Sequence, residues 1–173
     1  MEAPLNPAGA FVPEENYGPT RRDELIAVIE TAPAALRTAV AGLSESQLDT
    51  RYRNWTVRQI AHHLADSHVN SYARFKLALT EESPTIKPYD EGRWSELPDA
   101  RTGDVRTSLA LLEGLHSRWV HVLRSMTEEQ FARCYFHPET RSTVSLSAAL
   151  CSYAWHCRHH TAQITWLRAR HGW

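Results

Sequence analysis

Four long segments of the chain carry apolar residues three and four positions apart, the spacing of an amphipathic helix. They cover approximately residues 20–42, 56–80, 104–125 and 145–170. Each apolar stripe must be buried against another element, and the 173 residues suffice for one domain with its own core. The sequence therefore predicts an all-α fold, a four-helix bundle, as a single domain over residues 1–173.

Local signals mark several helix ends. Thr56 and Gln59 have the spacing of a capping box, so the second helix should begin after Thr56. The first helix should start at Thr20 and end near Gly42. Pro33 lies inside that helix and should kink or break it.

The connecting segments differ in character. Residues 1–19 are rich in proline, glycine and asparagine, and we expect an extended N-terminal arm. Residues 81–103 form a long loop that contains prolines, and such loops are usually functional or cover another segment. Residues 127–130 should start a short helix, and the non-helical stretch after it is compatible with a small hairpin before the last helix.

Composition excludes several classes of function. The net charge of −1 provides no basic surface for nucleic acid or anionic lipid, so we expect neither as a partner. Residues 1–20 lack the basic and apolar regions of a secretory signal, so we expect none there, and no segment has the roughly 20 apolar residues of a membrane span. Three cysteines argue against a disulfide framework and favour a reducing, cytoplasmic location.

Histidines are numerous and clustered. The last helix contains "YAWHCRHH" at residues 153–160, in which His156 and His160 lie four positions apart on or beside the apolar stripe. His159 lies off that stripe, and we expect it, like Arg158, to face outward or into a dimer contact. The pair His156 and His160 is therefore the candidate for a buried role.

The second helix contains "HHLADSH" at residues 62–68. His63 and His68 flank opposite edges of its apolar stripe, whereas His62 should point into solvent. In the third helix, His116 faces the core and, like His68, is expected to support a site or the core packing.

A buried imidazole needs a hydrogen-bond partner or a metal ion. Two histidines at positions i and i+4 can chelate one ion, and a third ligand must come from another helix. His63 can supply it if the second and last helices are neighbours, although periodicity alone does not choose between His63 and His68. Two interpretations remain open here: hydrogen-bonded core histidines, or a three-histidine metal site with an open coordination position.

At these residues the chain resembles the YfiT branch of the DinB-like superfamily. The matching stretches, in family order, are "WTVRQIAHHLADSHVNSYARFKLALTE", "PTIKPYDEGRW", "LHSRWV", "FHPE", "YAWHCRHHTAQI" and "LRARHGW". The resemblance implies a DinB-like four-helix bundle whose metal ligands are His63, His156 and His160. It also implies one divalent ion per subunit, Zn²⁺ or Ni²⁺, and a homodimer.

Members of this branch are described as metal-dependent hydrolases, and related proteins activate a low-molecular-weight thiol such as bacillithiol. A thiol S-transferase acting on a small-molecule electrophile is our leading hypothesis, because a metal-bound thiol ionises readily. The alternative is a hydrolase that uses metal-bound water, for which Asp90, Glu91 and His116 are the candidate general bases. A non-catalytic metal-binding bundle is the second alternative.

A further hypothesis concerns the residues that contact the thiol or the substrate. Asn70 and Arg74 extend the His63 side of the second helix and could face the mouth of a cavity, or be a solvated rim. Tyr89 and Trp94, in the long loop, could form a lid with Asp90, or pack against one end of the bundle. No catalytic side chain is identified from the sequence.

Overall fold

The structure is a computed structural model that describes residues 2–173. Four long helices dominate it: α1 (Pro19–Val40), α3 (Val57–Thr80), α6 (Val105–Ser125) and α8 (Leu146–His171). Short helices connect them: α2 (Glu45–Leu48), α4 (Glu91–Trp94), α5 (Pro98–Thr102) and α7 (Glu128–Ala132). Two small antiparallel hairpins pair β1 (Arg51–Tyr52) with β2 (Trp55–Thr56) and β3 (Cys134–His137) with β4 (Ser142–Ser145). The predicted all-α bundle and the hairpin before the last helix are confirmed.

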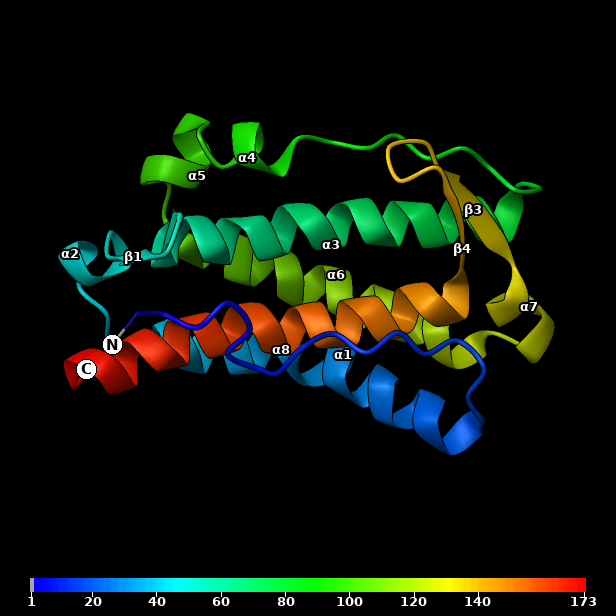
Figure 1. The fold of residues 1–173 in the computed structure, drawn as a ribbon, viewed down its shortest axis with the longest axis horizontal. Coiled ribbons are helices and arrows are strands. Elements are labelled where there is room, and N and C mark those ends of the chain that lie inside the picture. Colours follow the sequence, from blue (N-terminus) through cyan, green and yellow to red (C-terminus); the bar gives the residue numbers. More distant parts are fainter. Residues whose placement is uncertain (1) are drawn as a thin grey trace.

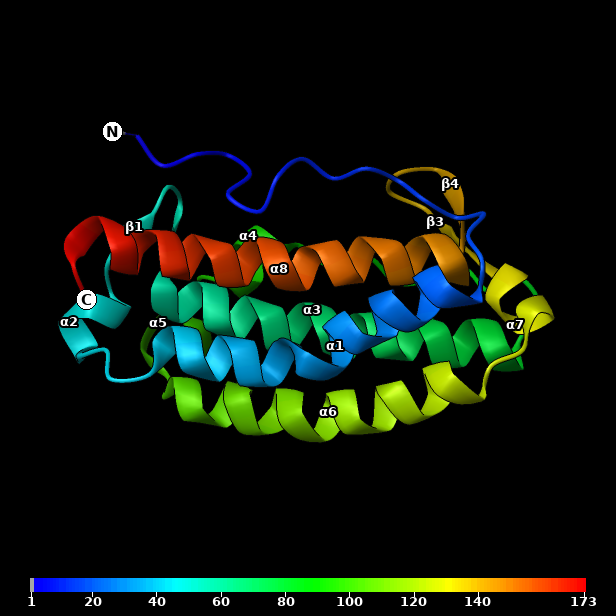
Figure 2. The same cartoon turned by 90° about the horizontal axis from the view of Figure 1, so that it is seen from below.

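The four long helices form a bundle in which α1 contacts α6 and α8, and α3 contacts the same two helices. Helices α1 and α8 run in one direction, and α3 and α6 run in the opposite direction (Figures 1 and 2). The predicted contact between the second and last long helices, α3 and α8, is therefore present. No helix within residues 2–173 combines the length and the apolar character that crossing a membrane requires.

The parallel direction of α3 and α6 explains the long loop between them. Helix α3 has 24 residues and is about 36 Å long, so the chain must return along it before α6 can begin. The loop and the short helices α4 and α5 make this return along the outer side of α3 (Figure 1). Its first part is fixed to β3, because Ile86 N–H donates to the carbonyl of Phe136 and Phe136 N–H donates to that of Pro84.

The core consists of two apolar clusters, one toward each end of the bundle. The first contains Phe75, Trp119 and Leu150, and the second contains Ile60 and Ile164. On α3, His68 lies between Ala65 of the second cluster and Phe75 of the first. On α8, His160 lies between Cys157 of the first cluster and Ile164 of the second. Two buried histidines therefore lie where the two apolar clusters meet.

Helix ends follow the predicted signals in most places. The capping box at Thr56 is present, with Gln59 N–H donating to Thr56 Oγ1 and Thr56 N–H donating to Gln59 Oε1. Pro33 does not break α1, which continues from Pro19 to Val40 and changes direction near its middle (Figure 2). The bend is the expected effect of a proline inside a helix.

The segment before α1 is extended and runs along α8 toward the C-terminal end of the bundle (Figures 1 and 2). Trp155 Nε1–H donates to the carbonyl of Gly9 at 3.0 Å, and the Tyr52 hydroxyl donates to that of Pro4. The segment therefore covers the outer side of α8 next to the histidine-rich stretch.

Candidate metal centre

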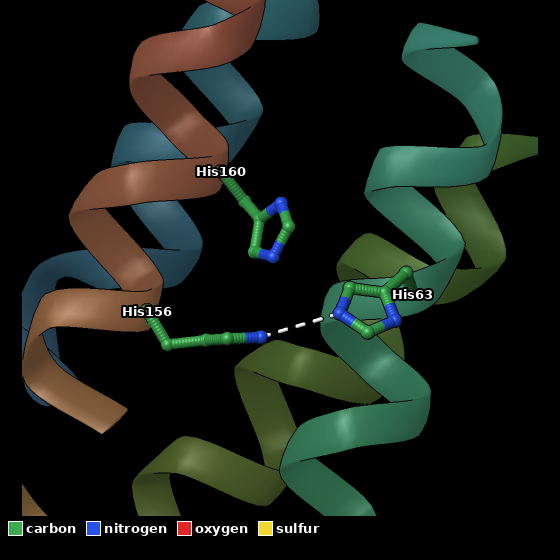
Figure 3. A group of neighbouring side chains, drawn as sticks. All are labelled: His63, His156 and His160. Atoms are coloured by element: carbon green, nitrogen blue, oxygen red, sulfur yellow. Dashed lines mark hydrogen bonds between the residues drawn. The ribbon is translucent and has the colours of Figure 1, made fainter. Parts of the chain in front are cut away.

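His63 of α3 and His156 and His160 of α8 point toward one another across the α3–α8 interface (Figure 3). One ligand nitrogen from each ring lies within 4.8 Å of those of the other two. The Nε2 atoms of His63 and His156 are 3.2 Å apart. Two imidazoles come from successive turns of α8, and the third comes from the facing helix, so the packing of α3 on α8 assembles the cluster.

The spacing fits a single ion. Zinc binds histidine nitrogens at about 2.0–2.1 Å, and a tetrahedral arrangement then places two ligand nitrogens about 3.3 Å apart. The measured 3.2 Å between His63 Nε2 and His156 Nε2 agrees with that value. The three imidazoles leave a coordination position for a small molecule, as catalytic zinc sites do.

Burial keeps these imidazoles neutral. It lowers the pKa of His63 and of His156 well below the ordinary value, and the pKa of His160 falls to about 4. Neighbouring imidazoles lower the pKa of each ring further. Neutral imidazole is the form that binds a metal, so this cluster is ready to bind one near neutral pH.

A glutamine orients the third ligand. His160 Nδ1–H donates to Gln163 Oε1 at 2.8 Å, which leaves the lone pair of His160 on Nε2. The amide nitrogen of Gln163 then donates to His159 Nε2 at 3.0 Å. Gln163 thus connects two adjacent histidines and directs only His160 toward the cluster.

Two expectations about histidine exposure were wrong. His159 is only 8% exposed and stacks on Trp155, because the extended N-terminal segment covers this side of α8. His62 is only 6% exposed, because the start of α6 and the segment before it cover it, and it bonds to Ser108 Oγ of α6 and to the Gly103 carbonyl. Arg158 is exposed, as expected.

His68 and His116 are buried and bonded to one another and to the cluster. His116 contacts the Ile29 carbonyl through Nδ1 at 2.5 Å and His68 Nδ1 through Nε2 at 2.7 Å. His68 Nε2 lies 3.2 Å from His156 Nδ1. Both ring nitrogens of His116 are therefore occupied, which removes it as a general base.

Two surface cavities reach the cluster. One of about 390 Å³ contacts His160, and the other, of about 940 Å³, contacts His156. Glu91 lines both cavities. A third cavity, of about 860 Å³, lies along α1 and α6 and contacts none of the three clustered histidines.

Of the three proposed substrate contacts, two line a cavity at the cluster and one does not. Arg74 and Tyr89 line the 940 Å³ cavity with His156, and the Arg74 Nε atom is buried without a hydrogen-bond partner. Asn70 instead donates to the Asp66 carbonyl of its own helix and is absent from the lining of both cavities. Pro88, Tyr89 and Glu91 of the long loop line this cavity, whereas Trp94 packs on Tyr89, with ring centroids 4.6 Å apart, and is not part of its lining.

Asp90 and Glu91, two carboxylates of the long loop, differ in their surroundings. Asp90 accepts from Arg93 N–H as the cap of α4 and pairs with the Arg93 guanidinium. The pKa of the Glu91 carboxyl is raised, first because neighbouring protein atoms partly remove it from water. The negative charges of Glu139 and Asp90 raise it further. Glu91 is therefore the better candidate for a proton acceptor, because a raised pKa makes its carboxylate a stronger base.

One residue of the site was missed by sequence reasoning. Trp55 packs against the rings of His63 and His160, with centroid distances of 4.4 and 6.1 Å, and it lines the 390 Å³ cavity. Its place directly before the capping box at Thr56 indicated only packing at the start of a helix. The antiparallel hairpin β1–β2 is what turns the indole toward the cluster.

Comparison with known proteins assigns the family. The model of the DinB superfamily matches residues 29–164. The chain belongs to the DinB superfamily. It is 53% identical over 169 residues to "Putative metal-dependent hydrolase YfiT" of Bacillus subtilis, covering 96% of this chain and 95% of that protein. A "Putative metal-dependent hydrolase" of Bacillus cereus is 51% identical, with 96% of each chain covered.

The structural comparison agrees. The solved structure of YfiT from Bacillus subtilis superposes with a TM-score of 0.94 and 52% identity, covering 97% of each chain. That protein is described as "a probable metal-dependent hydrolase with an unusual four-helix bundle topology". The parallel pairs α1–α8 and α3–α6 give the present bundle a topology that also differs from simple up-and-down order.

Proposed function

We propose that the protein is a metal-dependent enzyme in which His63, His156 and His160 hold one divalent ion, Zn²⁺ or Ni²⁺. The proposal is supported by the convergence of three neutral imidazoles within 4.8 Å and by the printed names of the relatives. Three protein nitrogens leave room for a reactant, whereas structural zinc is usually closed by four ligands.

The reaction we propose is thiol S-transfer. The observation that carries it is the presence of two cavities, one at His160 and one at His156, because a transferase must hold a thiol and an electrophile together. A bound zinc or nickel ion supplies Lewis acidity that deprotonates a coordinated thiol. Glu91, which lines both cavities, would accept the thiol proton. The sulfur would then bond to the carbon of the electrophile as the leaving group departs with its electron pair.

The chain's own residues divide the remaining work. Trp55 excludes water from one side of the cluster. Arg74, whose buried Nε has no hydrogen-bond partner among the described residues, offers a guanidinium for an anionic group of the thiol or substrate, and Tyr89 lines the same cavity. Asn70 is withdrawn from the substrate contacts, because its amide is bound within α3.

Hydrolysis is the second candidate, and a specific observation favours it. Of the three candidate general bases named from the sequence, we favour Glu91, because it lines both cavities and has a raised pKa. Replacement of Glu91 by glutamine should then abolish the hydrolysis of esters or amides. S-transfer should be slowed less, because the coordinated thiol ionises on the metal.

A thiol-dependence assay separates the candidates. The zinc-loaded protein is mixed with bacillithiol, or with other low-molecular-weight thiols, and with a chromogenic aryl halide. His63→Ala is the inactive control and His121→Ala, on the exposed face of α6, is the matched one. S-transfer predicts product only with thiol present. Ester turnover without thiol would favour hydrolysis.

A bound metal with neither activity would support the non-catalytic alternative. In that case chelation should lower the melting temperature, and no small thiol should bind. We also propose a homodimer, on the basis of the family resemblance alone. Sedimentation equilibrium should then give twice the chain mass of 19.7 kDa.

A further inference from the structure

We propose that a relay of buried imidazoles, running from His156 through His68 to His116 and ending at the carbonyl of Ile29, fixes the tautomer of His156. His68 and His116 are thus positioning residues for the metal centre. The inference rests on the proposed metal site, and it goes beyond the three ligands themselves.

Only one placement of the ring hydrogens satisfies every hydrogen bond of the relay. A backbone carbonyl only accepts, so His116 Nδ1 carries the hydrogen that it donates to Ile29 at 2.5 Å. The other nitrogen of neutral His116, Nε2, must then accept from His68 Nδ1–H at 2.7 Å. His68 Nε2 is left as an acceptor and receives Nδ1–H of His156 at 3.2 Å. The lone pair of His156 is thereby placed on Nε2, the atom that faces His63.

Burial supports the neutral state that this argument requires. His68 is 1% exposed and His116 is 2% exposed, and a charged imidazole in such surroundings is costly. The Cys157 sulfur lies 3.9 Å from His68 Nε2, and burial raises the pKa of this cysteine to about 12. Cys157 therefore lies beside the His68 nitrogen that accepts from His156 Nδ1–H.

The relay crosses the whole bundle. Its members come from α8, α3, α6 and α1 in turn, so each long helix contributes one group. A neutral histidine left without this relay could place its hydrogen on either nitrogen, and only one choice leaves Nε2 free for a metal. Outer partners of this kind typically contribute 10–100-fold to metal affinity.

Zinc affinity of three variants tests the inference. His68→Leu removes the acceptor of His156 Nδ1–H and keeps the interior apolar, so affinity should fall about 10–100-fold. His68→Gln keeps an acceptor and a donor and should restore most of that loss. His62→Leu is the matched control. It removes another buried, hydrogen-bonded histidine of the same helix, one outside the relay, and affinity should remain that of the original protein.

His116→Leu tests the length of the relay. Its side chain is separated from His156 by His68, yet its loss frees His68 to present N–H toward His156. Zinc affinity should therefore fall several-fold. An unchanged affinity in this variant would overturn the role of His116.

A second readout does not depend on metal. Long-range ¹H–¹⁵N spectra of the metal-free protein should show His156 with its hydrogen on Nδ1, and His68→Leu should shift it toward the other tautomer. The relay is refuted if His156 carries its hydrogen on Nε2, or if His68→Leu binds zinc no worse than His62→Leu. Failure of the original protein to bind zinc, with the Nδ1–H tautomer present, would instead refute the proposed function alone.

Discussion

Acid should destabilise the metal-free protein through its buried imidazoles, and His160 allows the size of this effect to be worked out. Burial lowers its pKa to about 4 from an ordinary value of 6.5. Between these values the unfolded chain binds a proton that the folded chain does not, so stability falls as pH falls. The difference of 2.5 pKa units corresponds to about 3 kcal/mol at 1.36 kcal/mol per unit.

The assay is urea unfolding of metal-free protein at pH values from 7.5 to 4. His160→Leu removes this titrating group, so its free energy of unfolding should decrease less on acidification than that of the original protein. The gap between the two should reach about 3 kcal/mol near pH 4. His121→Leu, on the exposed face of α6, is the control. Parallel pH profiles for His160→Leu and the original protein would refute a neutral, buried His160.

Three further changes have expected sizes. Trp119→Ala removes a fully buried side chain packed on Phe75 and should lower the free energy of unfolding by about 3–5 kcal/mol, measured by urea denaturation. Thr56→Ala removes the capping box of α3 and should cost about 1 kcal/mol in the same assay, and an unchanged midpoint would contradict the cap. Gln163→Leu removes the acceptor of His160 Nδ1–H and should weaken zinc binding about 10–100-fold in calorimetry. Gln163→Glu, which still accepts, should not.

Periodicity predicted those features that depend on one helix. The range of α3, its cap at Thr56 and the inward direction of His63, His156 and His160 all follow from spacing within a single segment. The contact between α3 and α8, which brings the three histidines together, was predicted only as a condition. The apolar stripe of one helix does not show which other helices are its neighbours in the bundle.

The two wrong predictions, the exposure of His62 and of His159, depend on contacts between segments that are distant in the sequence. Helical phase correctly placed His62 and His159 away from the apolar stripes, but it does not reveal which later or earlier segment covers a face. The N-terminal segment covers one, and the connection between α5 and α6 covers the other. The hydrogen bond from His116 to the Ile29 carbonyl could not be predicted either, because every residue has a backbone carbonyl and the sequence does not show which one a side chain contacts.

The central claim is a metal centre built from three histidines on two helices. Its most direct test is the zinc content of the loaded protein together with X-ray absorption at the zinc edge. We expect one zinc per chain, with scattering from three imidazoles at about 2.0–2.1 Å, and loss of the zinc in His63→Ala. A chain that retains no zinc, or a His63→Ala variant that retains it with unchanged scattering, would contradict the account.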